Sequence, residues 1–297
     1  MRWPRACKLT GRWAPSSSCS SSPTSRHPKR SSCSLPKSFP RSPSHPFLLS
    51  PATELPRIIR RMGSDERASR AGRFKQALLA GDDVAVIAEI KRRSPSRGDL
   101  NTELDPAEMA AAYRDGGAVC LSVLTNHEMF GGSGDDLAAA AQASGLPVLR
   151  KDFITTIDDV HESHDMGADA LLLIVADLTG AQLAELHALS LSLGMDVLTE
   201  VKSESELEVA LEAGADVIGV NQREKPKSAA FTMDYQRAER LAPLLPEHVV
   251  KVAESGIAVP GGTTMSEVRD AGYDAALIGE ALVTSGNPVE RLKELLA

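Results

Sequence analysis

The chain has 297 residues, of which 42% are hydrophobic and 4% aromatic, and its formal net charge is −7. This length allows one large domain or two small ones. The negative charge argues against a nucleic-acid-binding protein, and no apolar run approaches the ~20 residues that a membrane span needs. The four cysteines, Cys7, Cys19, Cys33 and Cys120, lack metal-ligand spacing, so we expect neither disulfides nor a structural metal.

Residues 1–54 form a segment rich in Ser, Pro, Arg and Lys, and the first acidic residue is Glu54. No hydrophobic periodicity is visible there, so we expect a disordered tail. The composition also fits an organellar transit peptide, which would place the protein in a plastid rather than the cytoplasm. A third alternative is a spurious extension with the true start nearer Met62. Residues 55–297 are then the folded domain.

Residues 55–79 are expected to supply an extra N-terminal helical segment before the regular part of the fold. One predicted face carries Leu55, Ile58, Ile59 and Met62. The other carries Phe74, Leu78 and Leu79.

Residues 84–90 form a short apolar run, as expected for a parallel strand that is buried on both faces. Strand alternation assigns Ala85, Ile87, Glu89 and Lys91 to one face. A carboxylate and an ammonium group are therefore expected at the end of a buried strand, directly before a Ser-Pro-Ser-Arg-Gly loop.

From this strand onward, apolar strands alternate strictly with amphipathic helices. The predicted strands are 84–90, 119–124, 148–151, 170–175, 196–200, 217–220, 249–253 and 275–278. The predicted helices are 105–115, 135–144, 157–166, 179–193, 204–213, 233–245, 264–271 and 289–296. Eight such units predict an α/β fold, the (β/α)8 TIM barrel, with the active site at the carboxyl ends of the strands.

A glycine turn recurs before every second strand, at Gly117, Gly167, Gly214 and Gly272. Each glycine is expected to end a helix and lead into a strand, as in a fourfold repeat of a double unit. A doubly wound open sheet is the alternative fold. It is disfavoured because a dinucleotide site of that fold would need a G-x-G-x-x-G motif, which is absent.

Polar residues end six of the predicted strands on the inward phase. The residues at these strand ends are Glu89, Lys91, Lys151, Glu200, Asn221, Arg223 and Glu254, with Ser255 after the seventh strand and Gly279 and Glu280 at the end of the eighth. Burying so many charges is costly unless they pair or meet a ligand, so they predict a site for an anionic substrate that needs both an acid and a base. Ser255-Gly256 and Gly279-Glu280 occupy the usual phosphate position of a barrel. The Glu280 side chain is expected to point away from the phosphate.

Two phenylalanines follow the second and third strands, Phe130 and Phe153. They either pack beneath loops or form an aromatic slot for a flat substrate ring. The neighbouring His127 is expected to be solvated.

The strings at the strand ends resemble the indole-3-glycerol phosphate synthase family. The matching strings are AEIKRRSPSRG, LSVLTNHEMFGGS, PVLRKDF, ADALLLIV, LTEV, IGVNQR, VAESGI and LIGEAL. The resemblance implies ring closure of 1-(2-carboxyphenylamino)-1-deoxyribulose 5-phosphate with loss of carbon dioxide and water, in tryptophan biosynthesis, without cofactor or metal.

The family pattern assigns a role to each matched residue. Lys151 would donate to the ketone oxygen during ring closure, Lys91 would assist in anion binding and dehydration, and Glu200 would be the base-side carboxylate. Glu89 and Asn221 would hold the sugar hydroxyls and the lysines. The substrate's anthranilate part would meet Ser94, Phe130, Phe153 and Arg223, and its phosphate Ser255, Gly256 and Gly279. Glu254 is expected to contact substrate, and Glu89 or Glu200 to balance the charge of Lys151.

Two stretches depart from the family pattern. Gln222, Glu224 and the lengthened loop 225–230 follow the sixth strand, and 258–264 is rich in glycine. Only 55–62 resembles the family's N-terminal helix. Neither departure touches the catalytic positions, so substrate details are affected more than the reaction class.

Rival functions remain open. One rival is another phosphosugar barrel. A phosphoribosylanthranilate isomerase would need a Cys/Asp pair as acid and base, and no such pair is found. A Schiff-base aldolase would need a nucleophilic lysine on the sixth strand, where this chain has Asn221. A non-catalytic phosphate-ligand-binding barrel would be expected to have lost Lys151 or Glu200. We expect a small phosphorylated substrate and no nucleic-acid or membrane partner. We expect the protein to be a monomer, with association with other tryptophan-pathway enzymes as the alternative.

Overall fold

The computed structural model describes residues 70–95, 97–224 and 232–297. The predicted tail 1–54, the 55–62 helix, the loop 225–230 and the three cysteines before residue 34 lie outside the described residues. Cys120 is free and buried. No described helix is long and apolar enough to cross a membrane.

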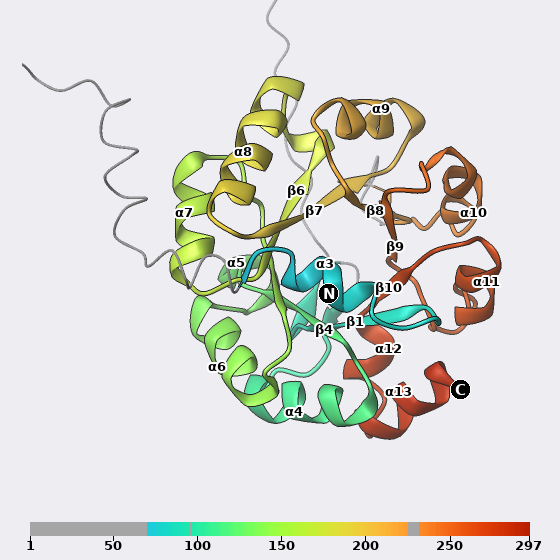
Figure 1. Ribbon diagram of the computed structural model, residues 1–297. Coiled ribbons are helices and arrows are strands. Elements are labelled where there is room, and N and C mark those ends of the chain that lie inside the picture. The colour runs from blue at the N-terminus through green and yellow to red at the C-terminus, as the bar shows by residue number, and fades with distance from the viewer. Residues whose placement is uncertain (1–69, 96, 225–231) are drawn as a thin grey trace, which may run out of the picture. The chain divides into compact units, whose positions relative to one another are not determined.

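Eight parallel strands close into a barrel in chain order, with the helices outside (Figure 1). The strands are β1 (Ala85–Ile90), β4 (Cys120–Leu124), β5 (Val148–Lys151), β6 (Ala170–Ile174), β7 (Asp196–Val201), β8 (Val217–Asn221), β9 (Val250–Glu254) and β10 (Ala275–Ile278). Each pairs in parallel with the next, and β1 pairs with β10. This topology confirms the predicted TIM barrel.

One larger helix follows each strand of the barrel. These helices are α4 (Pro106–Gly116), α6 (Gly134–Ser144), α7 (Ile157–Asp165), α8 (Gly180–Ser192), α9 (Glu204–Glu212), α10 (Arg237–Leu241), α11 (Met265–Asp270) and α13 (Pro288–Leu296). Short elements that the sequence pattern did not predict are β2 (Arg93–Ser94), β3 (Gly98–Asp99), α5 (His127–Phe130), η3 (Val175–Asp177), η4 (Ala242–Leu244) and α12 (Glu280–Val283). Most of them lie in the loops after the strands.

The helix predicted over 233–245 is shorter in the structure. Met233 instead forms an isolated antiparallel bridge with Arg223. At the other end, Pro243 lies at the start of η4, where its missing N–H ends the regular α-helical bonding. The prediction of a single long helix was therefore wrong.

The four predicted glycine turns are confirmed. Gly117 and Gly167 have φ values of 103° and 84°, and Gly214 and Gly272 are also left-handed. A residue with a Cβ would be strained in this conformation.

Strand alternation divides the buried side chains into two cores. Ala85 and Ile87 belong to the barrel interior, whereas Val86, Ala88 and Ile90 belong to the layer between strands and helices. The same alternation continues to Glu89, which therefore faces the interior at its carboxyl end. The face assignment predicted for this strand is confirmed.

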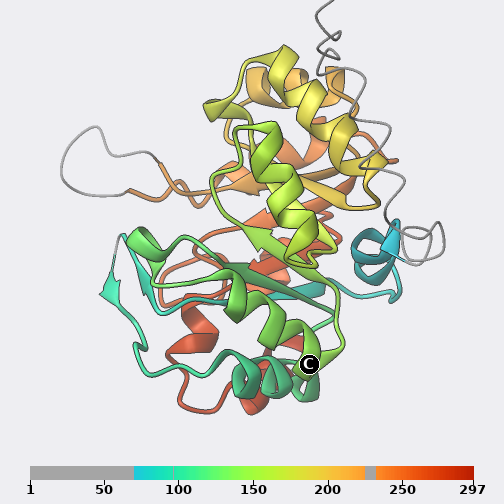
Figure 2. The ribbon, with the colours of Figure 1, turned by 90° about the vertical axis from the view of Figure 1, so that its left-hand side faces the viewer.

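Helix α3 (Arg73–Leu78) closes the amino end of the barrel, opposite the β2–β3 hairpin (Figure 2). Phe74 and Leu78 pack into the interior core. Leu79 is 52% exposed, so its predicted place on the same face was wrong. It is the C-cap residue, where the helix ends and no longer holds its side chain on that face.

Carboxylates at the amino ends of the strands fix α3 in place. Asp196 accepts from the backbone N–H of Lys75 at 3.0 Å, and Lys75 Nζ pairs with Asp216 at 2.7 Å. Arg73 pairs with Asp169 at 3.1 Å. This end of the barrel is thus a structural seal, and the chemistry is left to the other end.

Replacing Phe74 by alanine is expected to destabilise the fold by about 3–5 kcal/mol, because the ring is completely buried and its loss leaves a cavity. The free energy of unfolding from a denaturant titration measures this effect. Leu79→Ala is the matched control and should change it by less than ~0.5 kcal/mol. Equal losses for both variants would contradict the packing described here.

Candidate active site

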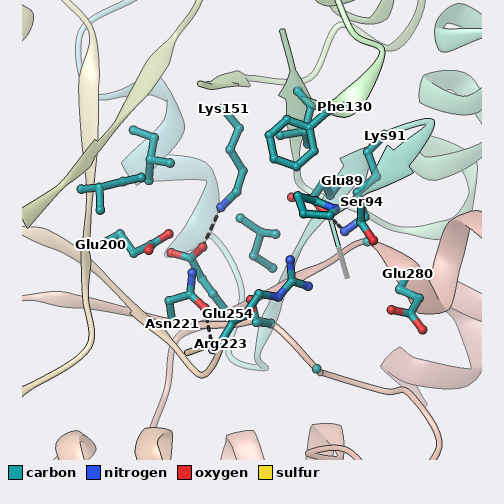
Figure 3. Close-up of a pocket in the computed structure, with 18 of the residues that line it drawn as sticks. Glu89, Lys91, Ser94, Phe130, Lys151, Glu200, Asn221, Arg223, Glu254 and Glu280 are labelled. Carbon is teal, nitrogen blue, oxygen red and sulfur yellow. Dashed lines mark hydrogen bonds and ion pairs between the residues drawn. The ribbon is translucent and has the colours of Figure 1, made fainter. Parts of the chain in front are cut away.

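One pocket of about 300 Å³ opens at the carboxyl ends of the strands (Figure 3). All the site residues predicted from the sequence line it: Glu89, Lys91, Ser94, Phe130, Lys151, Phe153, Glu200, Asn221, Arg223, Glu254, Ser255, Gly256, Gly279 and Glu280. The structure therefore brings together polar groups from strands that are far apart in the sequence.

Lys151 ends β5 and reaches across the pocket to β9, where its Nζ donates to Glu254 Oε2 at 2.8 Å. Glu200 and Glu89, which were expected to balance the charge of Lys151, do act on it electrostatically, but the direct partner is Glu254, because the closed barrel places β9 opposite β5. Burial by itself lowers the pKa of Lys151, but the negative charge of Glu254 and then of Glu200 outweighs burial and raises it. The amine is therefore an ammonium group at any physiological pH.

Glu254 is 1% exposed, and its second oxygen, Oε1, has no hydrogen-bond partner. Burial raises the pKa of this carboxyl, and the attraction of Lys151 lowers it. The repulsion of Glu200 adds to the effect of burial, so the net result is a raised pKa. Gly219 makes room for the group, since a Cβ there would lie 1.9 Å from Oε1. Glu254 is the carboxyl of the site that most readily holds a proton.

Glu89 and Lys91 form an ion pair on the same face of the β1 end. Burial favours a higher pKa for Glu89, but the positive charges of Lys91 and Lys151 outweigh it, so the pKa is lowered and the group is ionised. A Cβ on Gly279 would lie 2.2 Å from Glu89 Oε2 and 2.7 Å from Lys91 Nζ. Glycine at this position is thus required by the pair.

Glu200 ends β7 and is held by a second lysine, Lys202, whose Nζ lies 3.0 Å from Glu200 Oε1. Burial opposes ionisation, but Lys151, Lys202 and a hydrogen bond from the Asn221 side chain together lower the pKa of Glu200. Lys202 was not predicted as a site residue, although its spacing of two from Glu200 places it on the inward phase of the strand. Of the three buried glutamates Glu89, Glu200 and Glu254, the first two have a lowered pKa and the third a raised one.

The aromatic part of the pocket lies at the ends of β4 and β5. The rings of Phe130 and Phe153 are stacked, with centroids 6.4 Å apart and an interplanar angle of 25°. Both side chains line the pocket together with Ser94 and Arg223. The two rings thus form an aromatic wall of the pocket, and their use as a slot for a flat substrate ring stays a prediction. His127 is exposed, as expected.

Ser255, Gly256 and Gly279 form the rim of the pocket on the β9–β10 side. Ser255 and Gly256 have positive φ values of 69° and 70°. Gln222, one of the departures from the family pattern, is buried and donates from Nε2 to the Ser255 carbonyl at 3.0 Å and to Thr263 at 3.1 Å. Gln222 therefore holds this rim in its unusual conformation.

Glu280 begins α12, and its carboxylate pairs with Arg97 at 3.1 Å. In Figure 3 the carboxylate lies apart from the Lys151–Glu254 pair. Glu280 also lines the pocket, and the expectation that its side chain points away from the phosphate stays a prediction. Among the described residues, no group of three or more His, Cys, Asp or Glu side chains is placed to hold a metal ion.

Comparison with known proteins agrees with this geometry. A family model described as indole-3-glycerol phosphate synthase matches residues 54–295. The chain is 49% identical over 220 residues to an indole-3-glycerol phosphate synthase from Mycolicibacterium vanbaalenii, covering 74% of this chain and 79% of the relative. The protein of the same name from Mycobacterium avium is 43% identical over 264 residues, which cover 84% of this chain and 95% of the relative.

Among solved structures, N-acetylmannosamine-6-phosphate 2-epimerase from Clostridium perfringens superposes with a TM-score of 0.52 at 14% identity, covering 71% of this chain and 92% of that chain. At this identity the likeness shows the barrel fold alone. The family model, by contrast, matches 54–295, which contains every strand of the barrel and the pocket residues, and the two relatives cover 74% and 84% of the chain. The chain belongs to the indole-3-glycerol phosphate synthase family.

Proposed function

We propose that the protein is an enzyme, a carboxy-lyase that closes 1-(2-carboxyphenylamino)-1-deoxyribulose 5-phosphate to indole-3-glycerol phosphate with loss of carbon dioxide and water. The observation that carries the proposal is the composition of a single pocket. It contains an ammonium group held by buried carboxylates, an aromatic pair on one side and a glycine rim on the other. These features suit an acid–base reaction on a substrate with a flat ring and a phosphate.

The two ends of the substrate would be bound on opposite sides of the pocket. The phosphate would lie against the backbone of Ser255, Gly256 and Gly279, where small residues permit close approach. The carboxyphenyl ring would lie near Phe130 and Phe153, with Ser94 and Arg223 near its carboxylate. This orientation holds the ring carbon and the ketone close together, which lowers the entropic cost of ring closure.

Ring closure begins when the carboxylate-bearing ring carbon attacks the ketone carbon. The ketone oxygen gains negative charge and takes a proton. Lys151 is the donor in this proposal, because it is fully charged and buried where an ammonium group stabilises a developing oxyanion strongly. Breaking the bond to the carboxylate then releases carbon dioxide and restores the aromatic ring.

The remaining step removes the new hydroxyl group as water and forms the pyrrole double bond. Lys91, paired with Glu89, would donate the proton to the leaving hydroxyl. Glu200 would accept the proton that the intermediate loses, since its lowered pKa keeps it ionised. Asn221 would orient Glu200 through their hydrogen bond.

The rival interpretations of the site receive less support. A Schiff-base aldolase needs a neutral lysine as nucleophile, whereas the pKa of Lys151 is raised and β8 ends in Asn221. The isomerase alternative needs a cysteine at the site, and Cys120 lies in the barrel core instead. A ring-closing synthase uses the charges of the pocket more completely.

The direct test is incubation of the protein with the carboxyphenylamino-deoxyribulose phosphate while indole absorbance and fluorescence are followed. Formation of indole-3-glycerol phosphate together with an equal amount of carbon dioxide is the expected result. Consumption of the substrate without an indole product would refute the proposal.

Gly279→Ala is expected to raise KM and to lower kcat, because the added Cβ would collide with Glu89 and Lys91 and would also crowd the phosphate rim. Inorganic phosphate should compete with substrate in the wild type and bind more weakly to this variant. Gly81→Ala is the matched control, since a Cβ at that position would meet no atom within 4 Å and the φ of Gly81 is ordinary. Normal phosphate inhibition of the Gly279→Ala enzyme would place the phosphate elsewhere.

We further propose that the enzyme is a cytoplasmic monomer. Residence in a plastid, and association with other enzymes of tryptophan biosynthesis, are the alternatives that the sequence leaves open. Size-exclusion chromatography with light scattering measures the oligomeric state, and mass determination of the native chain tests whether residues 1–54 are retained.

A further inference from the structure

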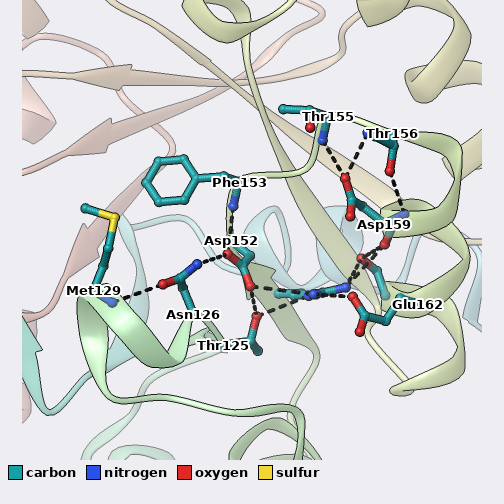
Figure 4. A network of polar contacts seen from close by, with 11 residues as sticks. Thr125, Asn126, Met129, Asp152, Phe153, Thr155, Thr156, Asp159 and Glu162 are labelled. Carbon is teal, nitrogen blue, oxygen red and sulfur yellow. Dashed lines mark hydrogen bonds and ion pairs between the residues drawn. The ribbon is translucent and has the colours of Figure 1, made fainter.

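In the sequence, Lys151 lies between two residues of opposite charge, Arg150 and Asp152, at the end of β5. Figure 4 shows Asp152 within a network of polar contacts that includes Thr125, Asn126 and Glu162. Neither residue has a role in the reaction as proposed above. Both side chains are largely buried, with 6% and 12% of their areas exposed. The cost of burying these charges calls for an account of what they fix in place.

The carboxylate of Asp152 accepts three hydrogen bonds. The Thr125 hydroxyl donates to Oδ2 at 2.6 Å, and the Asn126 side-chain amide donates to Oδ1 at 3.2 Å. The backbone N–H of Phe153 donates to the same Oδ1 at 2.9 Å. Asp152 therefore ties the segment that carries Lys151 and Phe153 to the end of β4.

Arg150 extends this network to the helix layer. Its Nε donates to Thr125 Oγ1 at 3.1 Å, so the hydroxyl accepts from Arg150 while it donates to Asp152. Its Nη1 donates to Ser163 Oγ at 3.1 Å, and its Nη2 to Glu162 Oε2 at 2.7 Å. The strand end is thereby clamped between β4 and α7.

Asn126 connects the network to the second aromatic ring. Its Oδ1 accepts from the backbone N–H of Met129 at 3.0 Å and so caps α5, the helix that carries Phe130. Its backbone carbonyl accepts from the N–H of Phe130 at 3.1 Å. One amide side chain thus joins Asp152 to the helix that positions Phe130.

We propose that Asp152 is a positioning residue that fixes Phe130, Phe153 and Lys151 relative to one another. The two rings come from loops after different strands, and both loops are bonded to this one carboxylate. Asp152 thereby sets the width of the aromatic slot and the direction from which Lys151 enters the pocket. The inference rests on the proposed function, in which these groups hold and protonate the substrate.

The expected consequence of loosening Asp152 is poorer placement of the ring and the ammonium group, with the phosphate rim untouched. Small displacements of groups near a reacting centre cost as much as ~10²-fold in rate. Asp152→Asn and Thr125→Val are therefore expected to lower kcat/KM by roughly 10- to 100-fold. Thr125→Val keeps the side-chain volume but removes the hydroxyl that links Arg150 to Asp152.

The experiment compares these two variants with two controls. Thr125→Ser keeps the hydroxyl and should recover most of the activity. Glu162→Gln alters only the exposed end of the network, where the carboxylate is 54% exposed, and should leave kcat/KM within about twofold of the wild type. Binding of anthranilate and of inorganic phosphate is measured separately by calorimetric titration of each protein.

Weaker anthranilate binding with unchanged phosphate binding in Asp152→Asn and Thr125→Val supports the proposal. Equal losses for both ligands together with a lower Tm would mean general loosening of the fold and would overturn it. Unchanged kcat/KM in both variants would overturn it as well. The wild-type turnover assay separates the two proposals. If the wild type does not form the indole product, the proposed function and this inference are both refuted. If the wild type is active and the variants are unaffected, only this inference is refuted.

Discussion

Replacement of Lys151 by methionine is expected to lower kcat by ~10²- to 10⁴-fold, the usual range for a lost acid or oxyanion donor. The ammonium group acts mainly in the transition state, where the ketone oxygen gains charge. KM should change much less, because the phosphate rim and the aromatic pair remain. Single-turnover and steady-state kinetics with the carboxyphenylamino-deoxyribulose phosphate separate the two effects.

The matched control for this variant is Lys251→Met. Lys251 lies within β9 between Val250 and Val252, which face the barrel interior, so alternation turns its own side chain toward the helices. Its kcat should stay near the wild-type value. A folded Lys151→Met protein with near-wild-type kcat would refute the assignment and transfer the donor role to Lys91.

Loss of Lys151 also changes the pH dependence of stability. In the Lys151→Met protein, Glu254 would lose its direct ion-pair partner. Its pKa is already raised, and without Lys151 it should rise further, so the folded variant holds a proton there. A group whose pKa is raised in the folded protein contributes its full stabilisation below the pKa of the unfolded chain, which is ~4.3 for a glutamate. This stabilisation is lost as the pH rises through the pKa of the folded protein. The Tm deficit of Lys151→Met should therefore grow from acid to neutral pH.

The barrel and the location of its site could be predicted from the sequence, because both follow from strand periodicity. Alternation in β1 separates Ile87 and Glu89 from Val86 and Ala88, and the structure keeps that separation. In a closed parallel barrel the carboxyl ends of all strands meet at one end, so inward polar residues there must share one pocket. Strand phase predicted Lys151, Glu200 and the other charged strand ends without any information on their pairing, whereas Ser94 was expected only from the family resemblance.

The pairing could not be read in the same way. Which carboxylate meets Lys151 depends on the stagger and tilt of strands that lie across the barrel, and alternation carries no information on either. Glu254 is the direct partner because β9 lies opposite β5 and Gly219 leaves space for its carboxylate. The network of Asp152 was also missed, since hydrogen bonds from Thr125 and Asn126 depend on loop geometry.

Departures from the family pattern proved to be informative about local structure. Gln222 directly follows β8, and the structure buries it beneath the Ser255 rim. Glu224, the next departure, pairs with Arg237 at the start of α10. Both residues therefore support the walls of the pocket, and neither enters the group of charges around Lys151.

Glu200→Gln is the second substitution with a large expected effect, again a fall in kcat of ~10²- to 10⁴-fold at neutral pH. Glutamine has nearly the same shape and its amide oxygen still accepts from Lys202 and Asn221, so the fold should persist. What the variant loses is the ability to take a proton. Glu204→Gln, an exposed acidic residue in the first turn of the following helix α9, is the control and should leave kcat unchanged.

The pH profile of the wild type gives the Glu200 assignment a second test. Lys151 and Lys202 hold the pKa of Glu200 below its ordinary value of 4.5, so the base stays ionised until the pH falls below that value. Activity that depends on this carboxylate, and the stability it contributes, are present above its unfolded-state pKa and are lost as pH falls through the lowered folded value. Protonation of Glu200 should therefore cause no decline of kcat near neutral pH, and an acid limb that this carboxylate produces lies below pH 4.5. An acid limb near pH 6–7 in the wild type that Glu200→Gln removes would contradict the lowered pKa, because roughly two units would separate it from the ordinary range of a glutamate.

Near-wild-type kcat in a folded Glu200→Gln protein would instead move the base role to Glu89, the other ionised glutamate of the pocket.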